Sequence, residues 1–255
     1  MENTDSFEEN VEVEAMLTFQ SNNPGTLVDN VAATGKFITL RQHHSIVKLP
    51  DSNFKPRLAD PRIGTNGPTI QDYSTAINED LFIRLVARHR LEKKDPYADR
   101  SEPVEPIIYY VDSGTPEPIK SALIEGASWW NEAFEAAGFI NAFRVMELPE
   151  GADAQDIRYN MIHWTHRRTR GYSYGGSVID PRTGEIIKGN VSLGSLRLRQ
   201  DYLIAAGLLA PYKDKNSIPD SMRQLALARI RQLVAHEIGH TLGFAHNFTA
   251  SANNR

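Results

Sequence analysis

Residues 234–248 read VAHEIGHTLGFAHNF and place His236, His240 and His246 at spacings of four and then six residues. These are three of the chain's eight histidines. On a helix, the first two lie one turn apart on the same side, so both imidazoles can bind one metal ion about 2 Å away. Gly243 can adopt the left-handed conformation that closes a helix, and the chain can then turn back with the third histidine. The stretch predicts a three-histidine metal site at the end of a helix.

The composition of this site favours catalytic zinc. Three neutral imidazoles leave one coordination position for water, which is typical of a catalytic zinc site rather than a structural one. Imidazole also suits Zn²⁺ better than it suits hard cations. Glu237 follows the first predicted ligand and can accept a proton from the water. The chain has no cysteine, so histidine and carboxylate groups must supply all the protein ligands.

Other histidine pairs are not predicted to bind metal. His163 and His166 lie three residues apart at a strand end, where two ligands rarely converge without others, so we assign them a structural or solvent-exposed role. His43 and His44 are adjacent and point to opposite faces of a strand.

The helix that carries the first two histidines is predicted from about Ser221, with Gln224 completing a capping box, to about Leu242. One stripe along it is apolar and is expected to pack on a sheet: Leu227, Ile230, Val234 and Ile238. A second stripe is polar throughout: Arg229, Gln232, His236 and His240. The histidines are therefore expected to face a cleft rather than the core.

The residues between 106 and 195 alternate between strand and helix patterns. Strands are predicted at 106–111, 142–148 and 156–164, and a pair of strands at 175–195 flanks a Pro-Arg-Thr-Gly turn. One helix is predicted at 118–138, with Trp129 and Trp130 used for packing. Arg197 and Arg199 are interpreted as part of an exposed strand edge or loop. The fold class is α+β, with a mixed sheet packed against helices.

The first hundred residues have a different character. Strands are predicted at 11–19, 36–49 and 81–90, separated by a loop at 49–69 with four prolines. The segment 91–106 is charged and contains three prolines, and we interpret it as a connector between domains. The predicted division is a β-rich domain with its linker at 1–100 and a second domain at 101–255.

Composition excludes several partners. The net charge of −4 gives no basic field that would attract nucleic acid or anionic lipid. The longest apolar run, residues 203–210, is far shorter than the roughly 20 residues that cross a bilayer. We therefore expect no nucleic-acid partner and no membrane span. The N-terminus is acidic and does not have the pattern of a signal peptide.

The stretch HEIGHTLGFAH at 236–246 resembles the metzincin metallopeptidases, because it matches their long zinc motif, His-Glu-x-x-His-x-x-Gly-x-x-His. Residues 109–139, 180–203 and 246–251 are similar to one branch, the bacterial zinc-dependent metallopeptidases with an EcxA-like catalytic domain. This resemblance implies that 101–255 is an upper subdomain, a mixed twisted sheet with a backing helix and an active-site helix. It implies that 1–100 is the C-terminal part of a β-rich upstream domain.

The same resemblance implies a function. The three histidines would bind one catalytic Zn²⁺, Glu237 would be the general base of a zinc metalloendopeptidase, and a strand within 175–180 would pair with a protein or peptide substrate. Family members are exported, which implies a periplasmic or secreted location.

The chain departs from the family pattern near its C-terminus. Metzincins carry a methionine turn well downstream of the third histidine, and this chain ends nine residues after it (255 minus 246). We therefore expect an internal fragment whose missing downstream subdomain, part of the same parent chain, is its natural partner. The isolated chain is expected to show little or no activity, with Phe244 and Phe248 exposed. The alternative function is an inactive truncated half-domain that binds zinc or acts as an interaction module.

Overall fold

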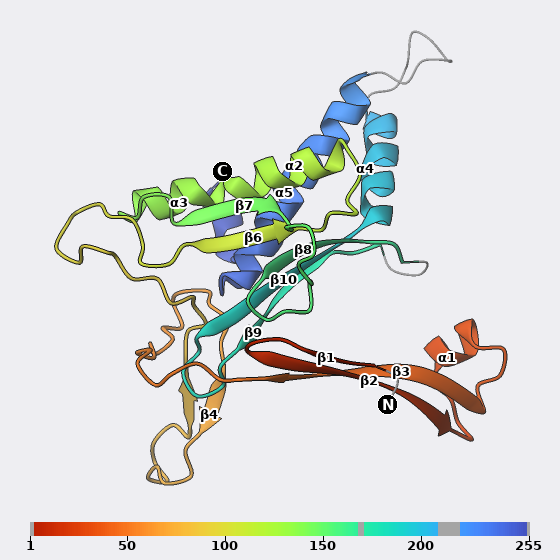
Figure 1. The fold of residues 1–255 in the computed structure, drawn as a ribbon, viewed down its shortest axis with the longest axis horizontal. Helices are drawn as coiled ribbons and strands as arrows, with labels where there is room; N and C mark the ends of the chain where they lie inside the picture. The colour runs from red at the N-terminus through yellow and green to blue at the C-terminus, as the bar shows by residue number, and fades with distance from the viewer. Residues whose placement is uncertain (1–2, 168–170, 209–219, 254–255) are drawn as a thin grey trace. The chain divides into compact units, whose positions relative to one another are not determined.

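The computed structural model describes residues 3–167, 171–208 and 220–253 (Figure 1). The chain forms two compact units, one made of residues 1–49 with 155–157 and the other of residues 50–154 with 158–255. The predicted α+β class is confirmed. The second unit begins upstream of the boundary predicted near residue 100, and that boundary remains a prediction about the family's domains.

The first unit is an antiparallel sheet in the order β1-β2-β3. Its strands are β1 (Asn3–Ser6), β2 (Asn10–Gln20) and β3 (Phe37–Val47), and helix α1 (Thr26–Val31) lies between the last two. The strands predicted at 11–19 and 36–49 are confirmed. Asn10 fixes residues 155–157 to this sheet, since its side-chain amide donates to the Gln155 carbonyl (3.1 Å) and its Oδ1 accepts from the Ile157 backbone N–H (3.0 Å).

The second unit contains a five-stranded sheet in the order β7-β6-β8-β10-β9. Its strands are β6 (Ile107–Val111), β7 (Phe143–Glu147), β8 (Asn160–Thr165), β9 (Tyr174–Ile179) and β10 (Ile186–Gly194). Neighbouring strands are parallel except at one edge, where β9 runs antiparallel to β10. The predicted strands and the turn between β9 and β10 are confirmed. The strand predicted at 81–90 is shorter, because only β5 (Phe82–Arg84) pairs with β4 (Thr69–Gln71).

The helix predicted at 118–138 is two helices, α2 (Ile119–Ser128) and α3 (Trp130–Ala136). At the break, the Ser128 hydroxyl donates to the Ile124 carbonyl (2.6 Å), a contact that bends helices. Packing of the tryptophan pair is confirmed for Trp130, whose indole N–H donates to the Ala235 carbonyl (2.8 Å), but Trp129 is 45% exposed.

The interpretation of Arg197 and Arg199 as a strand edge or loop is wrong, because they lie in helix α4 (Ser195–Leu208). Asp201, which is buried, forms an ion pair with Arg197 one turn earlier (3.2 Å) and faces Arg229 of the last helix at 3.9 Å. These contacts hold α4 against that helix. None of the described helices is long and apolar enough to cross a membrane.

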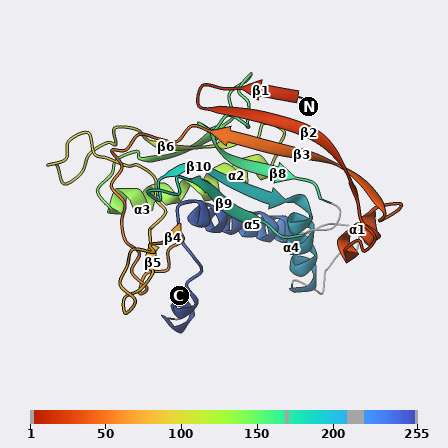
Figure 2. The same cartoon turned by 90° about the horizontal axis from the view of Figure 1, so that it is seen from below.

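Helix α5 (Asp220–Thr241) packs with α2 on the sheet (Figure 2). The apolar stripe predicted on α5 is confirmed, with Leu227 buried and Ile230, Val234 and Ile238 completely buried. These side chains join one core with residues of α2 and the strands: Leu123, Tyr109, Val111, Ile162, Val191 and Leu193. The core fixes the rotation of α5 and so turns its polar stripe away from the sheet.

Candidate metal centre

Helix α5 ends in a turn that only glycine can make. Gly243 has a φ of 99°, and the Phe244 backbone N–H donates to the Gly239 carbonyl at 2.9 Å. A Cβ at Gly243 would lie 2.1 Å from the Ala87 carbonyl oxygen, so both the backbone conformation and the surroundings require glycine. The predicted role of Gly243 is confirmed, and the turn brings the chain back toward the helix.

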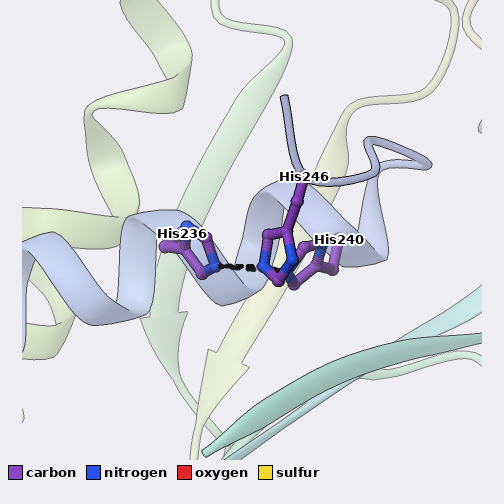
Figure 3. A group of neighbouring side chains, drawn as sticks. All are labelled: His236, His240 and His246. Carbon is purple, nitrogen blue, oxygen red and sulfur yellow. Dashed lines mark hydrogen bonds between the residues drawn. The ribbon is translucent and has the colours of Figure 1, made fainter. Parts of the chain in front are cut away.

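The turn brings His246 beside His236 and His240, as Figure 3 shows. The Nε2 atoms of the three side chains are separated by 3.1, 3.1 and 3.2 Å. Among the histidine, cysteine and acidic side chains of the described residues, these three histidines lie close enough together to share a metal ion. His236 and His246 are exposed and His240 is half-buried, so an ion and a ligand can reach the group from solvent.

A backbone carbonyl fixes the protonation of one ring. Nδ1 of His240 lies 2.8 Å from the Phe244 carbonyl oxygen. Because a carbonyl can only accept, Nδ1 carries the proton, and the Nε2 atom that faces the other two rings presents a lone pair. The ring of His240 is therefore in the tautomer that binds metal.

The arrangement fits a zinc ion. Two nitrogens bound about 2.0–2.1 Å from a tetrahedral ion are about 3.3 Å apart, close to the separations between these Nε2 atoms. Nitrogens that converge in this way present lone pairs to one point, which is unfavourable unless a cation or shared protons occupy it. All three histidines predicted from the sequence are thus brought together.

Glu237 lies on the side of α5 that packs against the edge strand β9. The residue is only 5% exposed, and burial raises the pKa of its carboxyl group, partly offset by the nearby His240 and by the backbone N–H of Gly175. A Cβ at Gly175 would lie 2.1 Å from the Glu237 carbonyl oxygen, so the strand approaches the helix closely. Its role as general base remains a prediction.

Two further hydrogen bonds hold this end of α5 against the sheet. The buried hydroxyls of Tyr109 and Thr241 are 2.7 Å apart, and the Ser177 hydroxyl donates to the Thr241 carbonyl (2.8 Å). The sequence analysis did not identify these contacts, because they join residues that are distant in the chain. Ser177 lies in the segment 175–180, where the sequence analysis places a strand that would pair with a substrate.

A cavity of about 560 Å³ beside the centre is lined by aromatic residues and by the histidines themselves. Trp130 stacks on Phe244 with ring centroids 5.7 Å apart, and Phe248 completes the aromatic lining. Phe244 is 46% exposed and Phe248 is 84% exposed, which confirms the exposed apolar surface predicted there.

The remaining histidines stay outside the centre. Nδ1 of His166 lies 2.8 Å from the Ser195 hydroxyl, and burial lowers the pKa of His163. His43 contacts the buried Glu12 in the first unit. Within the described ranges, none of these three joins a group that could hold a metal.

Two family models match parts of the chain. A model described as Met-zincin matches residues 219–255, and a domain of unknown function, DUF5117, matches residues 1–94. No curated protein matches the chain. The first match contains α5, the turn and all three histidines. The match and the histidine group together support a metzincin-like region, with zinc as the metal.

Proposed function

We propose that the chain carries the catalytic centre of a zinc-dependent metalloendopeptidase, with His236, His240 and His246 as the ligands and Glu237 as the general base. The observation that carries this proposal is the convergence of three Nε2 atoms within 3.2 Å of one another beside a buried carboxylate. The Met-zincin match over the same residues supports it.

Zinc held by His236, His240 and His246 would supply Lewis-acid polarisation of the scissile carbonyl and would lower the pKa of a bound water molecule. The Glu237 carboxylate would accept a proton from the attacking water as its oxygen adds to the carbonyl carbon, and would donate that proton to the amine nitrogen as the C–N bond breaks. The histidine side chains hold the ion and take no proton.

Strand β9 is the proposed contact for the substrate backbone. It pairs with β10 along one edge, and within the described residues no strand pairs with its other edge. An extended peptide can add to such an edge through main-chain hydrogen bonds. Gly175 and Ser177 connect this strand directly to α5, so a peptide bound there lies next to the metal centre.

Finer assignments are part of the same proposal. They are membership of the bacterial branch with an EcxA-like catalytic domain, residues 101–255 as an upper subdomain after a β-rich domain, and export to the periplasm or beyond. Their support is the resemblance of the motifs. Nothing in the described residues favours the alternative of an inactive half-domain.

The proposal is tested with the Glu237→Ala variant. Zinc content should stay near wild type, because the carboxylate is not a ligand, while peptide cleavage should fall by about 10² to 10⁴, the range for loss of a general base. Metal analysis and a fluorogenic peptide assay measure the two effects. Glu132→Ala, an exposed glutamate on α3, is the matched control. Joint loss of metal and cleavage would make Glu237 structural and refute its catalytic role.

A further inference from the structure

The turn that carries His246 is not held by α5 alone. Residues 64–66, which come early in the sequence of the second unit, also contact this turn. Thr65 and Phe244 form a short antiparallel bridge. The Asn66 backbone N–H donates to the Gly243 carbonyl (2.7 Å), and the Ala245 backbone N–H donates to the Gly64 carbonyl (3.0 Å). These bonds lie on both sides of Phe244 and immediately before His246, so they restrain the segment that presents the third ligand.

The side chain of Asn66 adds a contact with the metal site. Its amide nitrogen Nδ2 lies 3.3 Å from the Phe244 carbonyl oxygen. This oxygen is also the acceptor for Nδ1 of His240, at 2.8 Å. One carbonyl therefore links Asn66 to the ring orientation of His240. A carbonyl oxygen has two lone pairs, so it can accept both hydrogen bonds at once.

The pairing segment is itself held firmly. The Ala87 backbone N–H donates to the Asn66 carbonyl (2.8 Å), and the Leu85 backbone N–H donates to the Pro68 carbonyl (3.0 Å). Between them, Gly67 allows a close approach, since a Cβ there would lie 1.8 Å from the Leu85 carbonyl oxygen. The carbonyl oxygen of Ala87 also packs directly against Gly243. Residues 64–68 and 85–87 thus form a clasp around the turn at 243–245.

We propose that Asn66 is a positioning residue of the metal centre, and that the clasp sets zinc affinity by holding the turn before His246. This role for Asn66 rests on the proposed function. Without the clasp, the residues between the helix end and His246 would have to be ordered when the ion binds, and the backbone entropy lost at that step would weaken zinc binding. Contacts that orient ligands in this way typically change metal affinity about 10 to 100-fold.

The clasp joins the two family-model regions. Residues 64–87 lie within the DUF5117 match, and the turn and His246 lie within the Met-zincin match. The region of unknown function therefore supplies part of the zinc-binding unit of this chain. Removing or displacing it should weaken the site even though it contributes no ligand.

The first experiment measures zinc affinity by chelator competition. Asn66→Asp keeps the size of the side chain but removes the donor and places a carboxylate against the Phe244 carbonyl, and Asn66→Ala removes the contact. Both should weaken zinc binding about tenfold. The Co²⁺-loaded variants should show altered visible absorption, because the ligand geometry relaxes. Asn78→Ala, an exposed asparagine between β4 and β5, is the matched control.

The outcomes separate this inference from the proposed function. If His240→Ala loses zinc but both Asn66 variants bind zinc and Co²⁺ as wild type does, the positioning role is wrong and the metal site stands. If His240→Ala binds zinc as tightly as wild type, the site itself is wrong. Thermal unfolding of the metal-free variants, expected within a few degrees of wild type, excludes global unfolding as the cause.

A second experiment tests the clasp without reference to zinc. The pattern of hydrogen bonds makes Thr65 and Phe244 a non-hydrogen-bonded pair, with Cα atoms about 4.5 Å apart, within the disulfide range. The chain has no cysteine of its own. In chelator and oxidised glutathione, Thr65→Cys/Phe244→Cys should form an intramolecular disulfide, seen by mass spectrometry, and Thr65→Cys alone should not. Failure of the pair to form it would overturn the inference.

Discussion

The two faces of helix α5 differ in every property that bears on their roles. On one face, Ile230, Val234 and Ile238 are completely buried among the residues of α2 and the sheet. On the other face, His236 is exposed and His240 is half-buried, and their closest polar partners are each other, His246 and one backbone carbonyl. The first face supplies stability and the second supplies the candidate metal centre.

This difference teaches that stability and metal binding are separable along one helix. A change on the buried face should lower the free energy of unfolding and leave the Nε2 atoms in place. Replacing a histidine on the other face should remove metal and cost little stability. Glu237 is buried but adjacent to the ligands, so it lies between the two faces. A change at Glu237 is therefore the one most expected to affect both stability and metal binding.

The largest expected effect on stability comes from Ile238→Ala. This side chain is fully buried, and replacing isoleucine by alanine in a core typically lowers the free energy of unfolding by about 2–5 kcal/mol. Urea denaturation of the metal-free chain measures it, and the folded variant should still bind zinc. Gln232→Ala, on the exposed face, should change stability by no more than about 0.5 kcal/mol. Equal stability of Ile238→Ala and wild type would contradict the assignment of the faces.

His89, which lies outside the metal centre, provides a partly buried histidine to compare with the solvent-accessible ligands. The Nε2 atom of His89 is buried and has no hydrogen-bond partner among the described residues, and the ring lies edge-on to Tyr109. Burial lowers the pKa of His89 from 6.5 to about 4. The unfolded chain therefore binds a proton at this residue between these two pH values, and the folded chain does not. The stability that depends on neutral His89 is present above the unfolded pKa and is lost as the pH falls toward the folded one.

We expect His89→Leu to have a shallower loss of stability with falling pH. Between pH 6.5 and pH 4, wild type should lose about 1–3 kcal/mol more than the variant, with the lower end favoured because the ring is only partly buried. Urea denaturation at pH 7 and pH 4.5 measures the difference, and carboxyl groups cancel because both chains contain them. Parallel pH profiles would show that His89 does not titrate differently on folding.

Sequence patterns predicted the parts of the molecule that depend on local geometry. The buried stripe of α5, the spacing of His236 and His240, and the turn at Gly243 all follow from helix periodicity and from the conformational freedom of glycine. The strands of the main sheet were also found within a few residues, because buried strands leave continuous apolar runs.

The parts that the sequence did not predict depend on contacts between distant residues. Helix α4 has little apolar periodicity, and it is held by Asp201, which is buried against Arg197 and Arg229. The pairing of residues 64–66 with the turn at 243–245 consists mainly of backbone hydrogen bonds, which leave no pattern in side-chain types. The sequence signal there is Gly67, because a side chain at this position would clash with the Leu85 carbonyl oxygen. That reason for glycine can be recognised only when the structure shows that Leu85 lies against it.

The most direct test of the metal centre is the zinc content of the purified chain after dialysis. Wild type should retain about one zinc ion per chain, and Gln232→Ala, on the same polar stripe as the histidines, should retain the same amount. His240→Ala should lose most of the zinc, because two imidazoles cannot hold the ion in the geometry of three. Equal zinc in wild type and His240→Ala would contradict the assignment of His236, His240 and His246 as the metal site.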